Sequence, residues 1–513
     1  MPAPGAAPEH ITAHAMIEAV VDEDSYATWD SAPVLPATTD AYADSLRRAR
    51  ERTGVDESVL TGEATVDGRR VALIACEFGF LGGSIGVAAA ERITAAIERA
   101  TAEGLPVIAS PTSGGTRMQE GTTAFLQMVK IAAAAQNHKA AHLPYLVYLR
   151  NPTTGGVFAS WGSLGHITVA QPGALIGFLG PRVYAALYGE EFPDGVQTAE
   201  NLFRNGIVDG VVAPSDLRPL LVRALRVLAG SPEPPSHAAG PHAGPDPEAH
   251  VVSSCTDVPD VPAWQSVMLS RHGDRPGIRA LLAHSAADLV ALSGTGQGEV
   301  ESAMVLALAR IHGVPAVVLG QDRVAQTPTT PMGPGALREA RRAMRLAEQL
   351  RLPLVLVIDT VGAALSVAAE ERGLAPEIAR CVADLVTLRT ATVSIILGQG
   401  SGGGALALLP ADRVLAAQHG WLAPLPPEGA SAIVHRDTAH APQMAGEQGV
   451  RSRDLLRDGI IDAVVLEEAG EGPAELVARA GAAIAAELRA LADFGDDDRM
   501  RARLNRYRRL GLP

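Results

Sequence analysis

The sequence predicts an α/β protein built from two related domains in tandem. Three observations carry this prediction: apolar runs that alternate with helix-like segments, the same order of motifs in both halves, and a Pro- and Gly-rich stretch between the halves. Continuous apolar runs of strand length are typical of buried, largely parallel strands packed by helices. Of the 513 residues, 47% are hydrophobic and 19% charged, which excludes a disordered chain.

Each half begins its repeat with a helix-like run followed by a buried strand. In the first half AAERITAAIERATAEG precedes LPVIAS, which begins at Leu105. In the second half GALREARRAMRLAEQLR precedes LPLVLVID, which begins at Leu352. Both strands lead into a turn that contains glycine, PTSGGTR at Pro111 and DTVGAAL at Asp359.

A second strand then leads into a glycine-rich turn, PTTGGVFAS in one half and GSGGGALAL in the other. Leu105 and Gly155 are 50 positions apart, and Leu352 and Gly403 are 51 apart. The motifs NGIVDGVV and DGIIDAVV close the two repeats. Five landmarks in the same order at nearly equal spacing predict an internal duplication.

The domain boundaries follow from these landmarks. We expect an N-terminal extension over 1–39, a first domain over 40–228, a flexible linker over 229–260, a second domain over 261–490 and a charged tail over 491–513. The linker is rich in Pro, Ala, Gly and His and has no amphipathic period.

The net charge and the hydropathy of the chain limit the classes of partner that we expect it to bind. Acidic residues exceed basic ones by 14, which disfavours nucleic acid and anionic membranes as partners. No apolar run approaches the roughly 20 residues of a membrane helix. The start, MPAPGAAPEH, lacks the basic and apolar regions of a secretory signal. We therefore expect a cytoplasmic protein.

Lysine and cysteine are scarce. Lys130 and Lys139 are the only lysines and neither lies in a Walker P-loop, so a lysine-linked cofactor has two possible attachment points. The three cysteines are far apart with no C-x-x-C, which disfavours a zinc ribbon and a disulfide framework. We expect no metal.

Side-chain catalytic motifs are missing. We identify no nucleophile elbow, although GGSIG at Gly82 has the G-x-S-x-G spacing, and the sequence contains no H-E-x-x-H and no G-x-G-x-x-G after a strand with an acidic partner. His138 and His142 lack an evident third ligand and are expected to be ordinary surface histidines. Glu120 is expected to complement a helix dipole rather than to act as a general base.

The repeated Gly-Gly turns favour chemistry carried by the backbone. Without a Cβ, a ligand can approach the main chain, and a helix that starts there directs free N–H groups at it. Two such groups make an oxyanion hole. A single Gly-Gly turn would indicate only a tight turn of the chain. Here both halves carry a Gly-Gly turn after the corresponding strand, and Gly114–Gly115 adds another. The GGSIG segment at Gly82 stays open between a turn and a ligand-facing loop.

These motifs resemble the carboxyltransferase component of acetyl-CoA carboxylase, with the first half similar to the bacterial beta subunit and the second to the alpha subunit. The resemblance rests on CEFGFLGGSIG, SGGTRMQEG, PTTGGVFASWGSLGHITVAQPGALIGFLGPRV, MGPGALREARRAMRLAEQ, IDTVGA, SGGGALA, PPEGASAIVHRD and LLRDGIIDAVV. It covers residues 40–228 and 262–465 and implies two tandem crotonase-like domains of ββα repeats.

The chain departs from this family in three places. The four-cysteine zinc ribbon of the beta subunit is absent from the sequence. The alpha-subunit pattern D-T-P-G-A-Y-P-G reads DTVGAALS over Asp359–Ser366, and the preceding loop is shortened to GQDRVAQTPTT. The last two changes fall where the resemblance places biotin.

The resemblance implies transfer of a carboxyl group from N-carboxybiotin to the α-carbon of acetyl-CoA or a related acyl-CoA, giving a malonyl-type CoA. The released ureido oxyanion can itself take the α-proton. Such an enzyme needs one oxyanion hole for the thioester enolate and one for biotin.

The same resemblance assigns the site residues. The backbone donors are Gly114 and Gly115 on the acyl-CoA side and Gly404 and Ala405 on the biotin side. The substrate-binding positions are Gly82, Gly83, Arg117, Gly155, Gly156, Arg182, Gly362 and Gly403. Arg117, Lys130 and Arg182 are candidates for contacting CoA phosphates or for holding the loops.

The expected partners follow from what the chain lacks. It has no Ala-Met-Lys-Met acceptor and no ATP-binding domain, so biotin would arrive on a separate carrier protein loaded by a biotin carboxylase. The resemblance further implies a homo-oligomer, most simply a dimer. Two alternatives stay open: a biotin-independent decarboxylase of a malonyl-type thioester, and a non-catalytic scaffold that binds acyl-CoA or a partner subunit.

Overall fold

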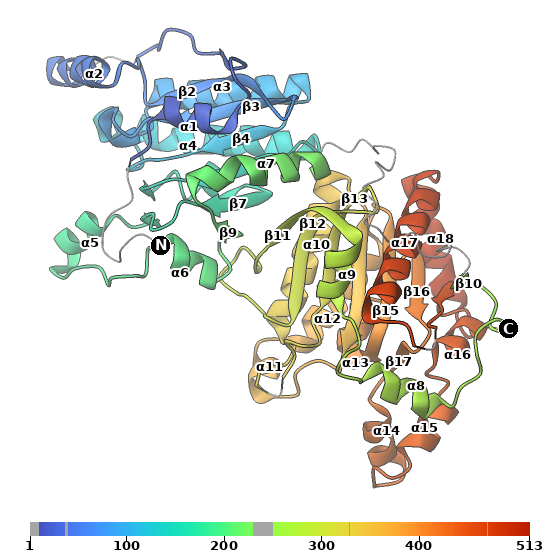
Figure 1. Ribbon diagram of the computed structural model, residues 1–513. Helices are drawn as coiled ribbons and strands as arrows, with labels where there is room; N and C mark the ends of the chain where they lie inside the picture. The colour runs from blue at the N-terminus through green and yellow to red at the C-terminus, as the bar shows by residue number, and fades with distance from the viewer. Residues whose placement is uncertain (1–9, 36–38, 229–249, 328, 469, 513) are drawn as a thin grey trace. The chain divides into compact units, whose positions relative to one another are not determined.

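The chain folds into two compact units, which Figure 1 shows in the computed structural model. The structure describes residues 10–35, 39–228, 250–327, 329–468 and 470–512. The first unit comprises 1–225 with 296–299, and the second comprises 226–295 with 300–513.

The first unit is built on a seven-stranded sheet. In spatial order its strands are β1 (Ala27–Thr28), β2 (Val59–Val66), β3 (Arg69–Cys76), β4 (Val107–Ser110), β5 (Tyr145–Leu149), β7 (Ile167–Ala170) and β9 (Gly210–Val211). The pairs up to β3 are antiparallel and those from β3 onward are parallel. Short strands β6 (Thr153–Thr154) and β8 (Ile176–Gly177) pair with each other outside this sheet.

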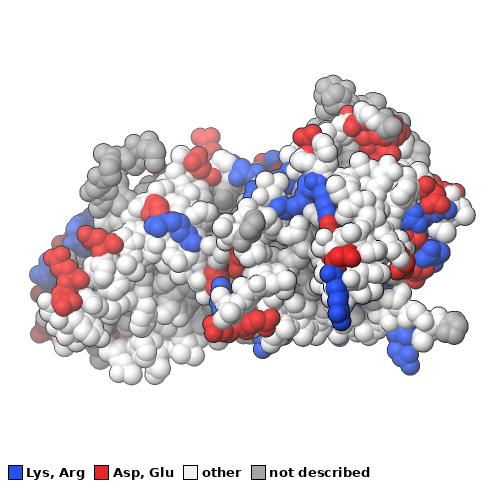
Figure 2. Space-filling model, turned by 90° about the horizontal axis from the view of Figure 1, so that it is seen from below, with Lys and Arg blue, Asp and Glu red and all other residues white. Residues whose placement is uncertain are grey.

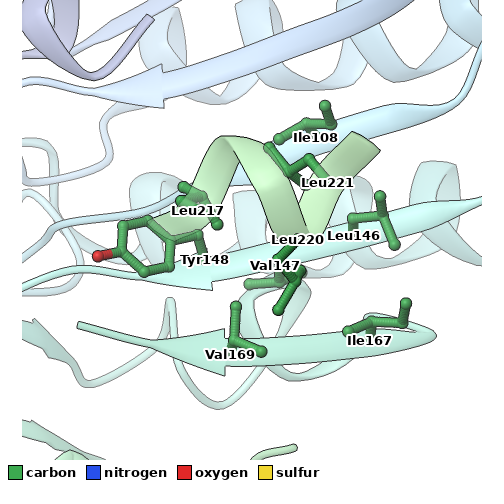
Figure 3. Close-up of a pocket in the computed structure, with 9 residues that line it drawn as sticks. All are labelled: Ile108, Leu146, Val147, Tyr148, Ile167, Val169, Leu217, Leu220 and Leu221. Carbon is green, nitrogen blue, oxygen red and sulfur yellow. The ribbon is translucent and has the colours of Figure 1, made fainter. Parts of the chain in front are cut away.

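Helices cover both faces of this sheet. They are α1 (Ala13–Val20), α2 (Asp40–Thr53), α3 (Val87–Glu103), α4 (Gly121–Ala140), α5 (Pro181–Tyr188), α6 (Ala199–Arg204) and α7 (Pro214–Leu228), with 3₁₀ turns η1 (Leu81–Gly83), η2 (Met118–Glu120) and η3 (Trp161–Ser163). Helices α3 and α4 share a core with one face of the strands. Helix α1 lies on the other face, where α7 places Leu217, Leu220 and Leu221 over β4, β5 and β7 (Figure 3).

The second unit is built on a nine-stranded sheet. Its strands are β10 (Val251–Val252), β18 (Ala463–Val465), β16 (Arg413–Ala417), β15 (Thr392–Ser401), β14 (Leu354–Thr360), β13 (Val314–Gln321), β12 (Met304–Ile311) and β11 (Ala286–Leu292) in spatial order, with β17 (Trp421–Ala423) beside the end of β15. The central strands from β13 to β18 are parallel. This order gives the parallel, buried strands that the apolar runs predict.

Helices also pack against the second sheet. They are α8 (Ala263–Ser270), α9 (Ile278–Ser285), α10 (Pro334–Leu350), α11 (Val367–Glu371), α12 (Leu374–Val386), α13 (Gly402–Leu406), α14 (Pro427–Val434), α15 (Ala441–Glu447), α16 (Ser452–Arg457), α17 (Pro473–Ala492) and α18 (Asp496–Arg509). Helices α9 and α17 share a core with β14, β15 and β16. Helix α10 packs on β13 and against α12.

The two units repeat the same local geometry. Helices α3 and α10 are both 17 residues long, and each begins after a glycine in nearly the same conformation: Gly86 has φ −97° and ψ −173°, and Gly333 has φ −96° and ψ −175°. The hairpins β2–β3 and β12–β13 both turn through two residues of positive φ, Asp67–Gly68 and His312–Gly313. Such turns match the twist of the flanking strands.

Three segments outside the expected domain cores are structured. In the expected linker, β10 pairs with β18, while 229–249 lie outside the described residues. In the N-terminal extension, the N–H of Ala13 donates to Glu77 Oε2 over 2.8 Å. In the charged tail, Arg503 of α18 is buried and contacts both carboxylate oxygens of Asp412 at 2.9 and 2.7 Å. Alternating charges predict exposure, but Arg503 and also Arg506, which donates to Asp462 Oδ2 over 2.6 Å, dock this helix.

Charged side chains are dispersed on the face drawn in Figure 2, where Lys and Arg alternate with Asp and Glu between wide uncharged areas. Among the helices that the structure describes, none is both long and apolar enough to span a bilayer.

The close packing around Gly320 on β13 gives a stability prediction. A Cβ there would lie 2.2 Å from Ile278 Cδ1 and 2.7 Å from Val357 Cβ, and the valine cannot rotate away. We expect Gly320→Ala to lower the free energy of unfolding by about 1–3 kcal/mol, measured by urea denaturation.

The matched control is Gly446→Ala on α15, where a Cβ meets no atom within 4 Å. Because alanine favours the helix, this change should raise stability by up to about 1 kcal/mol. A Gly320→Ala protein as stable as the control would show that the strand tolerates the side chain.

Candidate active site

In both units a buried strand ends in the same hydroxyl-to-glycine turn. The N–H of Gly115 donates to Ser113 Oγ over 2.9 Å, and the N–H of Gly362 donates to Thr360 Oγ1 over 3.1 Å. The φ angles of these glycines are 109° and 124°, which strain any residue with a Cβ. The two turns stand 247 positions apart, as do the starts of α3 and α10.

The two donors expected on the acyl-CoA side are engaged inside the protein. The N–H of Gly114 donates to the carbonyl oxygen of Gly82 over 2.9 Å, and that of Gly115 is held by Ser113. These residues therefore shape the turn, and neither of their N–H groups is free to bind a ligand.

A second glycine turn lies against the first. The N–H of Gly155 donates to the carbonyl oxygens of Gly177 and Phe178, both at 3.1 Å. The N–H of Gly156 has no acceptor among the described residues. A Cβ on Gly115 would lie 3.7 Å from Gly155 Cα, so bare backbone of the two turns forms one surface.

The corresponding turn of the second unit lies at the start of α13, directly after β15. Gly404 and Ala405 are buried there, and Gly403 is partly exposed. Gly404 is the third residue of α13, and the N–H groups at the start of a helix have no intrahelical acceptor. A buried backbone donor without a partner is costly, so this position favours a bound oxyanion. Gly362 lies close by, since a Cβ on Gly404 would be 3.7 Å from its carbonyl carbon.

The GGSIG segment forms a turn that packs on the Ser113–Gly115 turn. Gly82 and Gly83 have φ angles of 66° and 62°. A Cβ on Gly83 would lie 2.1 Å from the carbonyl oxygen of Thr112, so only glycine fits. Gly82 has open space beside its Cα and supports Gly114 through its carbonyl.

Arg117 holds loops together and is inaccessible to CoA phosphates. Its side chain is 0% exposed and contacts both carboxylate oxygens of Glu57, at 2.5 and 2.9 Å. It also donates to the carbonyl oxygen of Ser84 over 2.7 Å. Burial opposes its charge, but the hydrogen bonds with Glu57 keep the pKa of Arg117 above its ordinary value.

The other two cationic candidates are less informative. Lys130 on α4 is partly exposed and pairs with Glu91 at 2.7 Å. Arg182 follows Pro181 at the start of α5, but its side chain lies outside the described residues.

The expectation of a surface histidine is wrong for His138. It is fully buried, and its ring nitrogens contact Thr101 Oγ1 at 2.9 Å and the carbonyl oxygen of Pro144 at 3.1 Å. Burial lowers its pKa. Glu120 caps a helix as expected, although not its own: Oε2 accepts the N–H of Val87 at the start of α3, over 2.6 Å. The structure describes no cluster of three or more potential metal ligands.

Sequence reasoning did not single out Asp359, which the structure places at the base of the second half-site. The side chain is 0% exposed, and Oδ1 accepts the N–H of Gln399 over 3.0 Å. Oδ2 has no hydrogen-bond partner among the described residues and lies 3.4 Å from Arg323 Nε. Burial raises the pKa of Asp359 to about 6, against the opposing effect of Arg323. Its only sequence signal is its position at the end of an apolar strand.

Comparison with known proteins confirms the family resemblance. The model of the carboxyl transferase domain family matches residues 11–486. The chain is 64% identical over 505 residues to a probable biotin-dependent acyl-coenzyme A carboxylase beta3 subunit of Mycobacterium bovis, covering 98% of this chain and 99% of the relative. It is 39% identical over 479 residues to the acetyl-coenzyme A carboxylase carboxyl transferase subunits beta/alpha of Salinispora arenicola, covering 92% and 84%.

Solved structures show the same fold. The chain matches transcarboxylase 12S, crystallised with methylmalonyl-coenzyme A and methylmalonic acid, with a TM-score of 0.73 at 19% identity over 94% of this chain and 90% of that one. It also matches a single-chain, multi-domain long-chain acyl-CoA carboxylase with a TM-score of 0.69 at 18% identity, over 92% and 45%. The expected tandem crotonase-like fold is confirmed.

The buried pair predicts a stability loss on removal of one partner. We expect Arg117→Met to lower the free energy of unfolding by about 3–5 kcal/mol, because Glu57 would keep a buried, unpaired charge. The double variant Arg117→Met/Glu57→Gln should recover part of this loss. Urea denaturation of the three proteins measures both effects, and a double variant less stable than the single one would contradict the assignment.

The environment of Asp359 predicts a pH-dependent stability difference. Its folded pKa of about 6 lies above the ordinary value, so the fold favours the protonated form. The stability of the wild type relative to Asp359→Asn should therefore rise as pH falls through about 6 and level off below about 4, by about 3 kcal/mol in total. Denaturation across this range measures it; a flat difference would show that Asp359 titrates normally.

Proposed function

The chain belongs to the carboxyl transferase domain family, and we propose that it is the carboxyltransferase subunit of a biotin-dependent acyl-CoA carboxylase. The proposal is supported by one observation: both units present a glycine turn after a central strand, where the N–H of Gly156 has no acceptor among the described residues and Gly404 lies in the first turn of α13. Two such half-sites suit a reaction that generates two oxyanions in turn.

On the acyl-CoA side, the proposed work is to stabilise a thioester enolate. Gly156 would donate its N–H to the thioester oxygen as negative charge develops there. The touching turns of Gly115 and Gly155 leave the backbone bare, so the thioester can approach closely. Ser113 fixes the turn, since its hydroxyl holds Gly115 in the positive-φ conformation.

On the other side, the backbone around Gly404 and Ala405 would hold the ureido oxygen of biotin. Bound N-carboxybiotin supplies the carboxyl group. Once that group has left, the ureido group of biotin can act as the base that takes the α-proton. The altered Val361–Ser366 segment retains the geometry of its counterpart, because Thr360 and Gly362 form the same bond as Ser113 and Gly115. This retained turn favours a functional biotin half-site over a biotin-independent decarboxylase.

For the substrate we propose acetyl-CoA or a related acyl-CoA, with a malonyl-type CoA as product. Biotin would be delivered by a separate carrier protein and charged by a biotin carboxylase, in the cytoplasm. We also propose a homo-oligomer, because each unit exposes large apolar side chains near its half-site. These are Met118 at 81%, Phe125 at 59% and Val129 at 67% in the first unit, and Leu365 at 94% and Val367 at 74% in the second.

The proposal predicts biotin-dependent turnover in the reverse direction. The full chain is incubated with malonyl-CoA, with and without free biotin, and acetyl-CoA is followed by mass spectrometry. We expect turnover only with biotin. Gly404→Pro, which removes the proposed donor, should lower kcat by about 10²–10³-fold.

Gly404→Ala is the matched control, because it keeps the N–H and its Cβ meets mainly the flexible end of Met332, at 2.4 Å from Cε. Its kcat should fall much less than that of the proline variant. Turnover indifferent to biotin would replace the proposal with a decarboxylase, and equal losses in the two variants would remove Gly404 as a donor.

A further inference from the structure

Gln321 ties together the two loops that form the second half-site. It is the last residue of β13 and is 0% exposed. Its Oε1 accepts the N–H of Asp359 over 3.1 Å, and its Nε2 donates to the carbonyl oxygen of Gly404 over 2.8 Å. A single side-chain amide therefore bridges the end of β14 and the turn at α13.

The bond to Gly404 holds the backbone of the proposed donor residue itself. The N–H and the carbonyl of Gly404 belong to the same residue, so a carbonyl held by Gln321 limits the rotation that would turn the Gly404 N–H away from a ligand. The next N–H, that of Ala405, is the fourth of α13 and faces the carbonyl of the N-cap residue Ser401, which accepts the first intrahelical bond.

The adjacent peptide is held in an analogous way by the backbone. The carbonyl of Gly403, which shares a peptide plane with the Gly404 N–H, accepts the N–H of Ala407 over 3.0 Å. The Gly404 N–H is therefore held on both sides, by the helix through the carbonyl of Gly403 and by Gln321 through its own carbonyl. The first unit has Cys76 as the last residue of the matching strand β3, so this device is particular to the second unit.

We propose that Gln321 is a positioning residue for the biotin-side oxyanion hole, which it preorganises by holding the backbone of Gly404. The proposal rests on the function proposed above, since it assigns a role within that half-site. Gln321 touches no reacting atom; it acts through Gly404.

The test compares Gln321→Met with the wild type in the biotin-dependent turnover of malonyl-CoA by the full chain. Methionine fills a similar volume but neither donates to Gly404 nor accepts from Asp359. Loss of orientation should lower kcat by about 10–100-fold and leave the KM for malonyl-CoA within about twofold, because only transition-state stabilisation is lost.

Gln326→Met is the matched control. Gln326 holds the same loop, since its Nε2 donates to the carbonyl oxygen of Asp359 over 3.1 Å and its Oε1 accepts the hydroxyl of Thr360 over 2.6 Å. Replacing Gln326 leaves the bond from Gln321 to Gly404 in place. The proposal expects a smaller fall in kcat for this variant. Equal falls would show that Gln321 acts only by holding the loop at Asp359 and would overturn the proposal.

Gln321→Glu gives a second readout that does not depend on the folding of the methionine variant. A carboxylate repels the Gly404 carbonyl, but a protonated carboxyl can donate to it. The ratio of mutant to wild-type kcat should therefore rise as pH falls from about 8 to about 6. The positioning role alone is overturned by a ratio that does not change with pH, or by a Gln321→Met protein with wild-type kcat. If the wild-type chain shows no biotin-dependent turnover, the positioning role and the proposed function are overturned together.

Discussion

The hydrogen bond from the N–H of a glycine to a hydroxyl oxygen two residues earlier is the constraint on which both proposed half-sites depend. It holds Gly115 and Gly362 at large positive φ, where only glycine is comfortable. The turn then brings main chain rather than side chains to the surface, as the contact of Gly115 with Gly155 shows. Because a backbone N–H does not titrate, a site of this kind can stabilise negative charge without a general base.

The two units support this shared turn by different means. The first unit uses charge, since buried Arg117 connects the turn to Glu57 and Ser84. The position 247 residues later is Ala364, which cannot make such contacts. The second unit uses neutral amides instead, with Gln321 and Gln326 on either side of the Asp359–Thr360 segment. A duplicated architecture has therefore kept the backbone geometry while its supporting side chains diverged.

The burial of Asp359 shows that this arrangement is unfavourable for the stability of the fold. Its carboxyl is wholly buried, one oxygen lacks a hydrogen-bond donor, and burial raises its pKa to about 6. The compensating interactions are the charge of Arg323, 3.4 Å away, and the bond from the N–H of Gln399, which joins β14 to β15. Strain of this kind is typical of positions that serve a site rather than stability.

The sequence alone determined the duplication, the parallel strands and the glycine turns, because apolar periodicity and the need for glycine at positive φ are written locally in the chain. It predicted donors at Gly404 and Ala405 on one side and at Gly114 and Gly115 on the other, and the N–H groups of Gly114 and Gly115 proved to be bonded. Only the tertiary structure showed which N–H groups lack an acceptor, that Arg117 and His138 are buried, and that Gln321 reaches Gly404, 83 residues away. Such facts depend on contacts between distant segments, for which no local pattern carries a signal.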